Sequence, residues 1–181
     1  MLLEDRMGQA DMKHILLLAS LLLLGGCLGM PKTVTPVSAF DINRYLGEWY
    51  EIARLDHSFE RGMTHVKAEY AYREDGGVSV INRGFSTGKG VWREARGKAY
   101  FVKSPNEGYL KVSFFGPFYG SYVIFYLDDA YQHAFVSGPD LSYLWLLSRT
   151  PTVSDEVMKK FKLMAQERGF DLQKLVLVEQ Q

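Results

Sequence analysis

Residues 65–86, HVKAEYAYREDGGVSVINRGFS, decide the fold class. Apolar and polar side chains alternate here on both sides of the turn sequence Glu74-Asp75-Gly76-Gly77. Successive side chains of a strand point to opposite faces, so this pattern is typical of two antiparallel strands that each have one apolar face. The segment therefore predicts a β-hairpin in an all-β fold.

The same alternation extends in both directions from this hairpin, in short runs that turn residues separate. It predicts eight strands, near residues 48-56, 65-73, 78-86, 91-103, 109-115, 121-127, 131-138 and 142-149. Eight antiparallel strands joined by tight turns close most simply into an up-and-down β-barrel. Such a barrel has no exposed edge and can hold one small ligand.

A single helical pattern follows the strands. Apolar residues recur at helical spacing from Val157 to Ala165, after Ser154 as the N-cap residue and before Gly169. We expect this C-terminal α-helix to pack on the barrel wall. A short strand at 175-178 is expected to return beside the first strand.

Composition excludes several classes of protein. The chain has 181 residues, 21 basic and 21 acidic side chains and a hydrophobic fraction of 47%, which favours one folded domain over a disordered chain. Balanced, scattered charge offers no basic surface for a nucleic acid. The single cysteine, Cys27, rules out an intramolecular disulfide and a cysteine-rich zinc site.

The N-terminal region is typical of a secretory signal. An apolar run from Ile15 to Leu24 follows Lys13 and is too short for a membrane span, which needs about 20 residues. The sequence Leu24-Gly25-Gly26-Cys27 resembles the bacterial lipobox, which implies that Cys27 is lipidated and becomes the new N-terminus. Leu28 follows where aspartate favours inner-membrane retention in enterobacterial lipoproteins, so the resemblance implies the outer membrane. An ordinary signal peptide with an incidental cysteine is the alternative.

These features divide the chain into three parts. Residues 1-26 are expected to be the lipoprotein signal peptide, 27-39 a lipidated, extended tether, and 40-181 the barrel domain. The tether assignment rests on two prolines and the lack of apolar periodicity.

Two motifs near the ends of the barrel carry a family resemblance. Gly47-Glu48-Trp49-Tyr50 matches the GxWY motif of lipocalins, and Arg149 follows the eighth strand where lipocalins place an arginine over that tryptophan. Together with the lipobox, the stretch 138–151 is similar to the bacterial outer-membrane lipoprotein lipocalins. The resemblance covers roughly residues 40 to 178. It implies that Gly47, Trp49 and Arg149 are structural residues at the closed end.

Strand alternation then predicts which side chains face the barrel interior. Small residues among them suggest a cavity walled by aromatics, suited to a long apolar molecule with a polar head near the mouth. A barrel filled by its own side chains is the alternative. The expected ligand-binding residues are Ala68, Tyr70, Asn82, Gly84, Val112, Phe114, Tyr122, Ile124, Tyr143 and Trp145.

No catalytic or metal site is expected. The four histidines, His14, His57, His65 and His133, lack ligand spacing, and no GxSxG elbow is present. We therefore expect a protein without cofactor that binds, stores or transports hydrophobic ligands, such as fatty acids or lysophospholipids, at the cell envelope. The domain would be periplasmic, anchored in the outer membrane through Cys27. A structural envelope lipoprotein and a lipid-modifying enzyme are the alternatives, and a homodimer is left open.

Overall fold

The computed structural model describes residues 28–180. The expected signal peptide and Cys27 lie outside the described residues. The described elements, in chain order, are α2 (Ile42–Tyr45), β1 (Gly47–Leu55), β2 (Met63–Tyr72), β3 (Val78–Ser86), β4 (Val91–Phe101), β5 (Tyr109–Phe115), β6 (Phe118–Leu127), β7 (His133–Ser137), β8 (Leu144–Ser148), α3 (Asp155–Glu167), the 3-10 helix η1 (Leu172–Lys174) and β9 (Leu175–Leu177).

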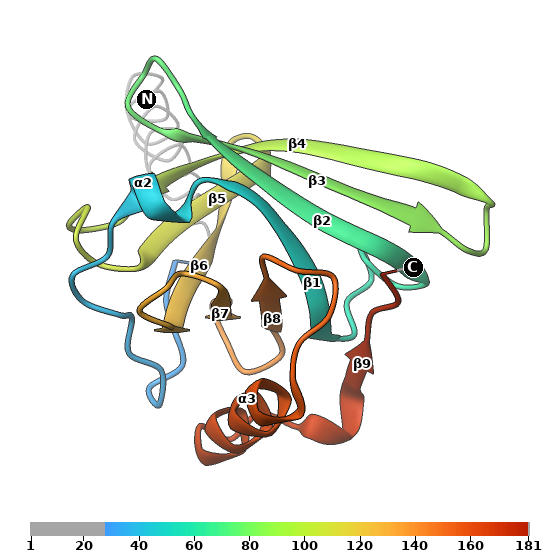
Figure 1. The fold of residues 1–181 in the computed structure, drawn as a ribbon. Coiled ribbons are helices and arrows are strands. Elements are labelled where there is room, and N and C mark those ends of the chain that lie inside the picture. The colour runs from blue at the N-terminus through green and yellow to red at the C-terminus, as the bar shows by residue number, and fades with distance from the viewer. Residues whose placement is uncertain (1–27, 181) are drawn as a thin grey trace, which may run out of the picture.

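The strands form one antiparallel meander that closes on itself. Each of β2 to β7 pairs with the next strand, β8 pairs with β1, and β1 pairs with β2 to complete the barrel. The predicted eight-stranded barrel with one C-terminal helix is thus confirmed (Figure 1). The expected return strand is β9, which pairs with β1. The seventh strand begins at His133 rather than at 131, because Tyr131 adopts a φ of 57° in the preceding turn.

The helix α3 packs on the outside of the barrel through its apolar face. Ser154 caps its N-terminus by accepting a hydrogen bond from the Val157 N–H. Phe161 and Ala165 are both 0% exposed and belong to a hydrophobic cluster between the helix and the outer faces of the strands. A second cluster fills the lower part of the barrel interior. The fold therefore has one core inside the barrel and one beneath the helix.

Residues 28–39, which we expected to form an extended tether between the lipid and the domain, are extended and lie against the barrel wall. The Gly29 N–H donates to the Ser121 hydroxyl at 2.9 Å, and the Val37 N–H donates to the Ile124 carbonyl at 2.8 Å. Val34 is only 3% exposed and belongs to the cluster beneath α3. Burial of such apolar side chains holds the segment in place. Residues 28–180 thus contain the closed sheet and both clusters, which is what an independently folding domain requires. From here on, the barrel domain means residues 28–180, because the segment 28–39 packs on the barrel that we expected to begin at residue 40.

The two ends of the barrel differ. The helix α2 lies at one end, the closed end, together with connections 73–77, 102–108 and 128–132. Connections 56–62, 87–90, 116–117 and 138–143 surround the other, open end. β4 pairs with β3 over its whole upper part but with β5 only from Lys98 to Phe101. The β3–β4 hairpin therefore projects beyond the rest of the barrel at the open end (Figure 1).

Candidate functional site

The closed end of the barrel is sealed by Trp49 and Arg149. Trp49 is 0% exposed, and its Nε1 donates to the Tyr45 carbonyl at 2.8 Å. The Arg149 guanidinium carbon lies 3.9 Å from the centroid of the Trp49 ring, a cation–π contact that contributes about 0.5 to 2 kcal/mol. The terminal nitrogens of Arg149 also donate to the backbone carbonyls of Arg44, Tyr45, Leu46 and Glu48. One arginine thus joins α2 to the first strand.

Gly47 gives this seal the space that it needs. Its φ is +94°, a conformation that glycine adopts without strain. A Cβ atom at this position would also lie 3.4 Å from an Arg149 terminal nitrogen. The three residues that the lipocalin motifs single out, Gly47, Trp49 and Arg149, therefore lie together at the closed end.

Cross-strand pairing shows which side chains share the inner face with Trp49. Trp49 pairs with Ala68, Ala68 with Asn82, and Asn82 with Ala95. Because directly opposed residues of antiparallel strands lie on the same face, all four point into the barrel. Ala95 is nevertheless exposed. The inward-facing side chains Asn82, Val112, Phe114 and Trp145 are only partly buried.

Two tyrosines expected near the mouth lie much deeper. Tyr70 pairs with Gly47 at the closed end, and its hydroxyl lies 2.9 Å from that of Tyr122. The Tyr122 hydroxyl lies 2.7 Å from that of Tyr45 in α2. Burial raises the pKa of all three phenols, which therefore stay neutral. The prediction was wrong about depth because strand tilt and shear offset positions that look equivalent in sequence.

Four further residues that we expected to line the cavity do not line the upper interior. Ala68 lies opposite Trp49, and Ile124 is 0% exposed in the closed-end cluster. A Cβ at Gly84 would lie 2.7 Å from the Met63 Cε, so a methionine already fills that space. Tyr143 precedes β8 and stacks on the ring of His57 at 4.7 Å. The predicted residues that line the upper interior are therefore Asn82, Val112, Phe114 and Trp145.

Sequence reasoning missed three charged side chains inside the barrel, which we call the acid–arginine cluster: Glu51, Arg54 and Glu60. They are 4%, 1% and 7% exposed. Arg54 donates to a Glu51 carboxylate oxygen at 2.6 Å and to the backbone carbonyls of Glu60 at 2.7 Å and Met63 at 3.1 Å. Trp145 Nε1 donates to a Glu60 carboxylate oxygen at 3.1 Å. The cluster thus fastens the 56–62 connection over the open end.

The acid–arginine cluster should give the stability of the domain a distinctive pH dependence. Burial raises the pKa of Glu51 and of Glu60 above the ordinary glutamate value. A carboxyl group with a raised pKa stabilises the fold at pH values below its unfolded pKa, and this stabilisation is lost as pH rises through the folded pKa. We therefore expect wild type to lose stability relative to Glu60→Gln as pH rises above the ordinary glutamate pKa of about 4.3. Urea unfolding of both proteins at several pH values measures this difference.

Comparing wild type with Glu60→Gln also removes the contribution of His57, whose dependence on pH has the opposite sign. Burial lowers the pKa of His57, so its contribution to stability falls as pH falls below its unfolded pKa. His57 is present in both proteins and largely cancels in the difference. A difference that stays constant with pH would show that the buried carboxyls do not titrate as their surroundings indicate.

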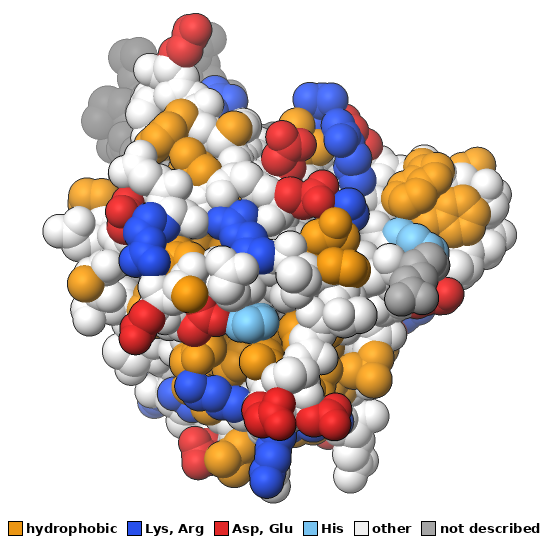
Figure 2. Space-filling view, viewed as in Figure 1, with side chains coloured by type: hydrophobic (Ala, Val, Ile, Leu, Met, Phe, Trp, Pro, Cys, Tyr) orange, Lys and Arg blue, Asp and Glu red, His pale blue; other side chains and the backbone are white. Residues whose placement is uncertain are grey.

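Large hydrophobic side chains gather around the open end. Each of the four connections at this end contains or adjoins at least one exposed large hydrophobic side chain, and Phe115 is 81% exposed. Figure 2 shows such side chains gathered over the projecting β3–β4 hairpin. Single exposed apolar residues are ordinary, but a ring of them around one opening marks a contact surface for apolar molecules. The residues are Phe59, Val91, Trp92, Phe115, Phe118 and Leu141.

The surface also has hollows that lie away from the open end of the barrel or on its outer face. Two hollows of about 240 Å³ and 200 Å³ lie outside the barrel, one at the closed end around Tyr131 and one on the outer sheet face beside Trp92. Within residues 28–180, histidine, cysteine and acidic side chains form no group of three that could hold a metal ion. No helix in the described part of the chain is long and apolar enough to cross a membrane.

Comparison with known proteins agrees with this architecture. A family model described as a lipocalin-like domain matches residues 40–180. The chain belongs to the lipocalin family. This lipocalin is 63% identical over 171 residues to the outer membrane lipoprotein Blc of Vibrio cholerae. The matched segment covers 94% of this chain and 100% of that protein. It is 55% identical to the outer membrane lipoprotein Blc of Escherichia coli K12, over 83% of this chain and 85% of the relative.

Solved structures share the fold of this lipocalin at low sequence identity. Lobster apocrustacyanin A1 superposes with a TM-score of 0.63 at 20% identity, over 83% of this chain and 93% of that one. Insecticyanin from the tobacco hornworm Manduca sexta gives a TM-score of 0.63 at 23% identity, over 83% of this chain and 86% of insecticyanin. Likeness at this level extends to the fold alone.

The family and its near relatives define what kind of protein this is. The lipocalin is an outer membrane lipoprotein, as its relatives' names state of them. Lipocalins bind small hydrophobic ligands, and the family is one of binding proteins rather than enzymes. The expected family, fold class and outer-membrane location are therefore confirmed.

Proposed function

We propose that the upper barrel interior binds single-chain amphiphiles, such as fatty acids or lysophospholipids, and that the protein stores or transports them at the cell envelope. The observation that carries the proposal is the partial exposure of inward-facing Asn82, Val112, Phe114 and Trp145. A barrel filled by its own side chains, as in a purely structural envelope lipoprotein, would bury these residues. Their accessibility favours a binding site over a packed core.

The two sides of this interior differ in polarity, which suggests how a ligand lies. Gly97, Val112 and Phe114 form an apolar wall on β4 and β5, and Ala95 continues the inner face of β4 toward the mouth, where β4 is not paired with β5. An acyl chain along this wall would gain about 0.8 kcal/mol for each buried CH₂ group. The interior is narrow, because a Cβ atom at Gly97 would lie only 2.9 Å from the Phe114 ring. We expect this ring to move aside when a chain binds.

The surroundings of the mouth fit a ligand that comes from a lipid phase. The exposed hydrophobic side chains flank all four connections of the open end. They would shield an acyl chain from water while it passes from a bilayer into the barrel. Polar groups beneath the mouth, including Glu60 and Trp145, would then face the head group.

We also propose that Cys27 carries the lipid anchor and that the domain lies in the periplasm. The motif Leu24-Gly25-Gly26-Cys27 supports lipidation, and the names of the relatives support an anchor of this kind. Gly29, two residues further on, is hydrogen-bonded to Ser121 in β6. An anchor at Cys27 would therefore hold the barrel close to the bilayer, without a long flexible tether.

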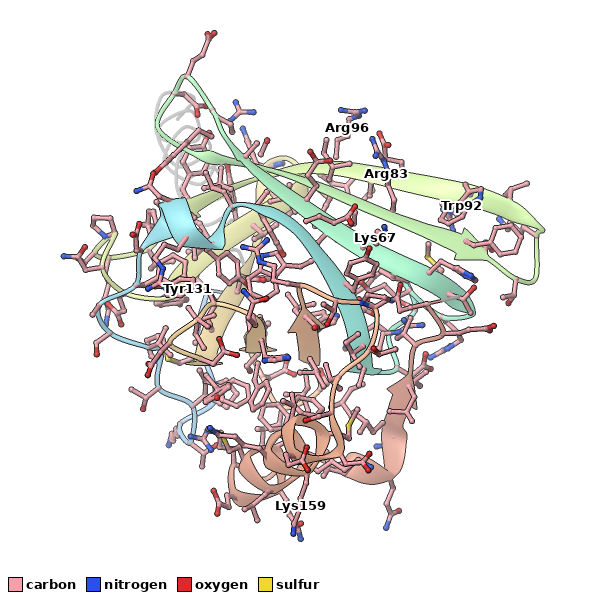
Figure 3. The ribbon with its side chains drawn as sticks, viewed as in Figure 1. Lys67, Arg83, Trp92, Arg96, Tyr131 and Lys159 are labelled. Carbon is pink, nitrogen blue, oxygen red and sulfur yellow. The ribbon has the colours of Figure 1, made fainter. Side chains whose placement is uncertain are left out.

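The binding site is tested by two neighbouring substitutions on opposite faces of β4. Ala95→Leu adds a side chain to the inner face, whereas Arg96→Leu adds an apolar side chain to the outer face, where Arg96 points away from the barrel (Figure 3). We expect Ala95→Leu to weaken binding of a fluorescent fatty acid at least about tenfold, because the new side chain occupies the path of the acyl chain. Arg96→Leu should bind as wild type does. Fluorescence titration of the folded barrel domain measures both.

Two results of this titration would refute the proposed site. One is a wild type without saturable binding of fatty acid or lysophospholipid. The other is equal affinity in the inward and outward variants. Gly84→Leu is unsuitable as a third variant, because the Met63 side chain already occupies that position.

Lipidation is tested by removing the thiol. With Cys27→Ala we expect the protein to leave the outer-membrane fraction and to be found free in the periplasm or uncleaved at the inner membrane, because no acyl chains can be attached. Cell fractionation with immunoblotting measures the distribution. Unchanged recovery of the variant with the outer membrane would contradict the role of Cys27.

A further inference from the structure

The acid–arginine cluster places an excess of acidic groups inside the barrel, beneath the mouth. A β-bulge between Glu51 and Ala53 shifts the phase of β1, so that Glu51 and Arg54 both face inward. Glu51 pairs with Leu147 and Arg54 with Trp145, a residue of the upper interior. The cluster is therefore part of the wall that a bound head group would meet.

Both terminal nitrogens of Arg54 already donate hydrogen bonds within the protein. One terminal nitrogen donates to Glu51, and the other donates to the carbonyls of Glu60 and Met63. The Arg54 Nε has no hydrogen-bond partner, so two buried carboxyl groups lie beside one guanidinium group of which only the terminal nitrogens are hydrogen-bonded. Burial raises the pKa of both Glu51 and Glu60, because removal from water disfavours the charged form of a carboxyl group.

The inner face of the barrel also carries a buried acceptor without a partner. Asn82 Oδ1 is buried on the inner face and has no hydrogen-bond partner. A buried acceptor without a partner costs about 1 to 3 kcal/mol, so a ligand group that donates to it gains affinity. Hydroxyl and ammonium groups donate hydrogen bonds, whereas an ionised carboxylate only accepts them.

We propose that the acid–arginine cluster selects amphiphiles whose head group donates hydrogen bonds and carries no net negative charge, in preference to fatty-acid carboxylates. This inference rests on the proposed function and names the ligand class for the same site. A buried carboxylate would face Glu51 and Glu60 at close range in a medium of low polarity, where repulsion between like charges is strong.

The other charged groups around the mouth do not reverse this preference. Arg61 is paired with Asp56 at 2.7 Å, and Asp56 and Asp140 add negative charge beside His57. Arg93 shares the inner face of the hairpin through its pairing with Gly84, but it is exposed to solvent on the projecting part. If Arg93 governed recognition, an anionic head group would bind more tightly.

The test compares two ligands with the same sixteen-carbon chain, palmitic acid and 1-monopalmitoylglycerol. Both are used as competitors of a fluorescent amphiphile on the barrel domain near pH 7.5. We expect monopalmitoylglycerol to bind at least about tenfold more tightly, and Glu60→Gln to remove most of this difference. Glu69→Gln, on the outer face of β2, is the matched control and should leave the ratio unchanged.

A measurement on wild type alone covers the case in which Glu60→Gln does not fold. Hexadecyl sulfate keeps its negative charge at every pH used. Its affinity should rise at least about tenfold as pH falls from 8 to 5 and the cluster takes up protons, while that of monopalmitoylglycerol stays constant.

The outcomes separate this inference from the proposed function. If neither ligand binds, both are wrong. If both bind but palmitate is equal or tighter, or if hexadecyl sulfate shows no pH dependence, the barrel binds amphiphiles and the acid–arginine cluster does not select among them. Loss of the preference in Glu69→Gln as well would likewise overturn the assignment to Glu60.

Discussion

Replacing Trp49 with alanine is expected to lower the free energy of unfolding by about 3 to 5 kcal/mol, the range for removal of a buried aromatic side chain. The indole is 0% exposed and packs against the Tyr45 ring at 4.8 Å between centroids. Its loss leaves a cavity at the closed end and removes the surface on which Arg149 stacks. Urea unfolding of the barrel domain, followed by circular dichroism, measures the change.

A second tryptophan provides the matched control. Trp92 is 63% exposed, so Trp92→Ala should change stability by no more than about 0.5 kcal/mol. Arg149→Ala should also destabilise, because it removes the hydrogen bonds that join α2 to β1. At temperatures where they are folded, Trp49→Ala and Arg149→Ala should keep most of their ligand affinity. Wild-type stability combined with abolished binding would show that the closed end is a binding site rather than a structural seal.

Arg54→Met is expected to be about as damaging, by about 3 to 5 kcal/mol near pH 8, because it leaves buried acidic groups without their cation. Arg54 is 1% exposed and joins Glu51 to the 56–62 connection. The cost should shrink toward pH 5, where the carboxyl groups of Glu51 and Glu60 take up protons and no longer need a counter-charge. Unfolding curves at both pH values measure it.

Arg61→Met is the control for this substitution. Arg61 lies in the same connection, but its side chain is 67% exposed, and exposed ion pairs such as that with Asp56 contribute little. We expect a change of no more than about 0.5 kcal/mol. If Arg54→Met were as mild as Arg61→Met, or if its cost did not depend on pH, the buried cluster would not hold the open end together.

The strands and the helix could be predicted because their patterns are local. Alternation over residues 65–86 reflects the two faces of each strand, and the helical spacing before Gly169 reflects one buried face of α3. The residues of the seal, Trp49 and Arg149, could also be placed, although they are far apart in sequence, because the lipocalin motifs mark both.

The interior was harder to predict because depth in a barrel is not a local property. Tyr70 lies on the expected face, yet strand tilt brings it to the closed end beside Tyr122. The bulge after Glu51 turns Arg54 inward against the alternation of β1, and no turn residue in the sequence marks it. The inward orientation of Glu51 could have been predicted, because it follows Trp49 by two residues and so shares its face.

The most direct test of ligand binding is to measure what the barrel domain carries when it is purified from the periplasm without detergent. Native mass spectrometry, with extraction and identification of any bound lipid, provides this measurement. We expect one single-chain amphiphile per polypeptide in wild type and in Arg96→Leu, and little in Ala95→Leu. Wild type with the mass of the polypeptide alone, or with no more lipid than Ala95→Leu, would contradict a ligand-binding barrel.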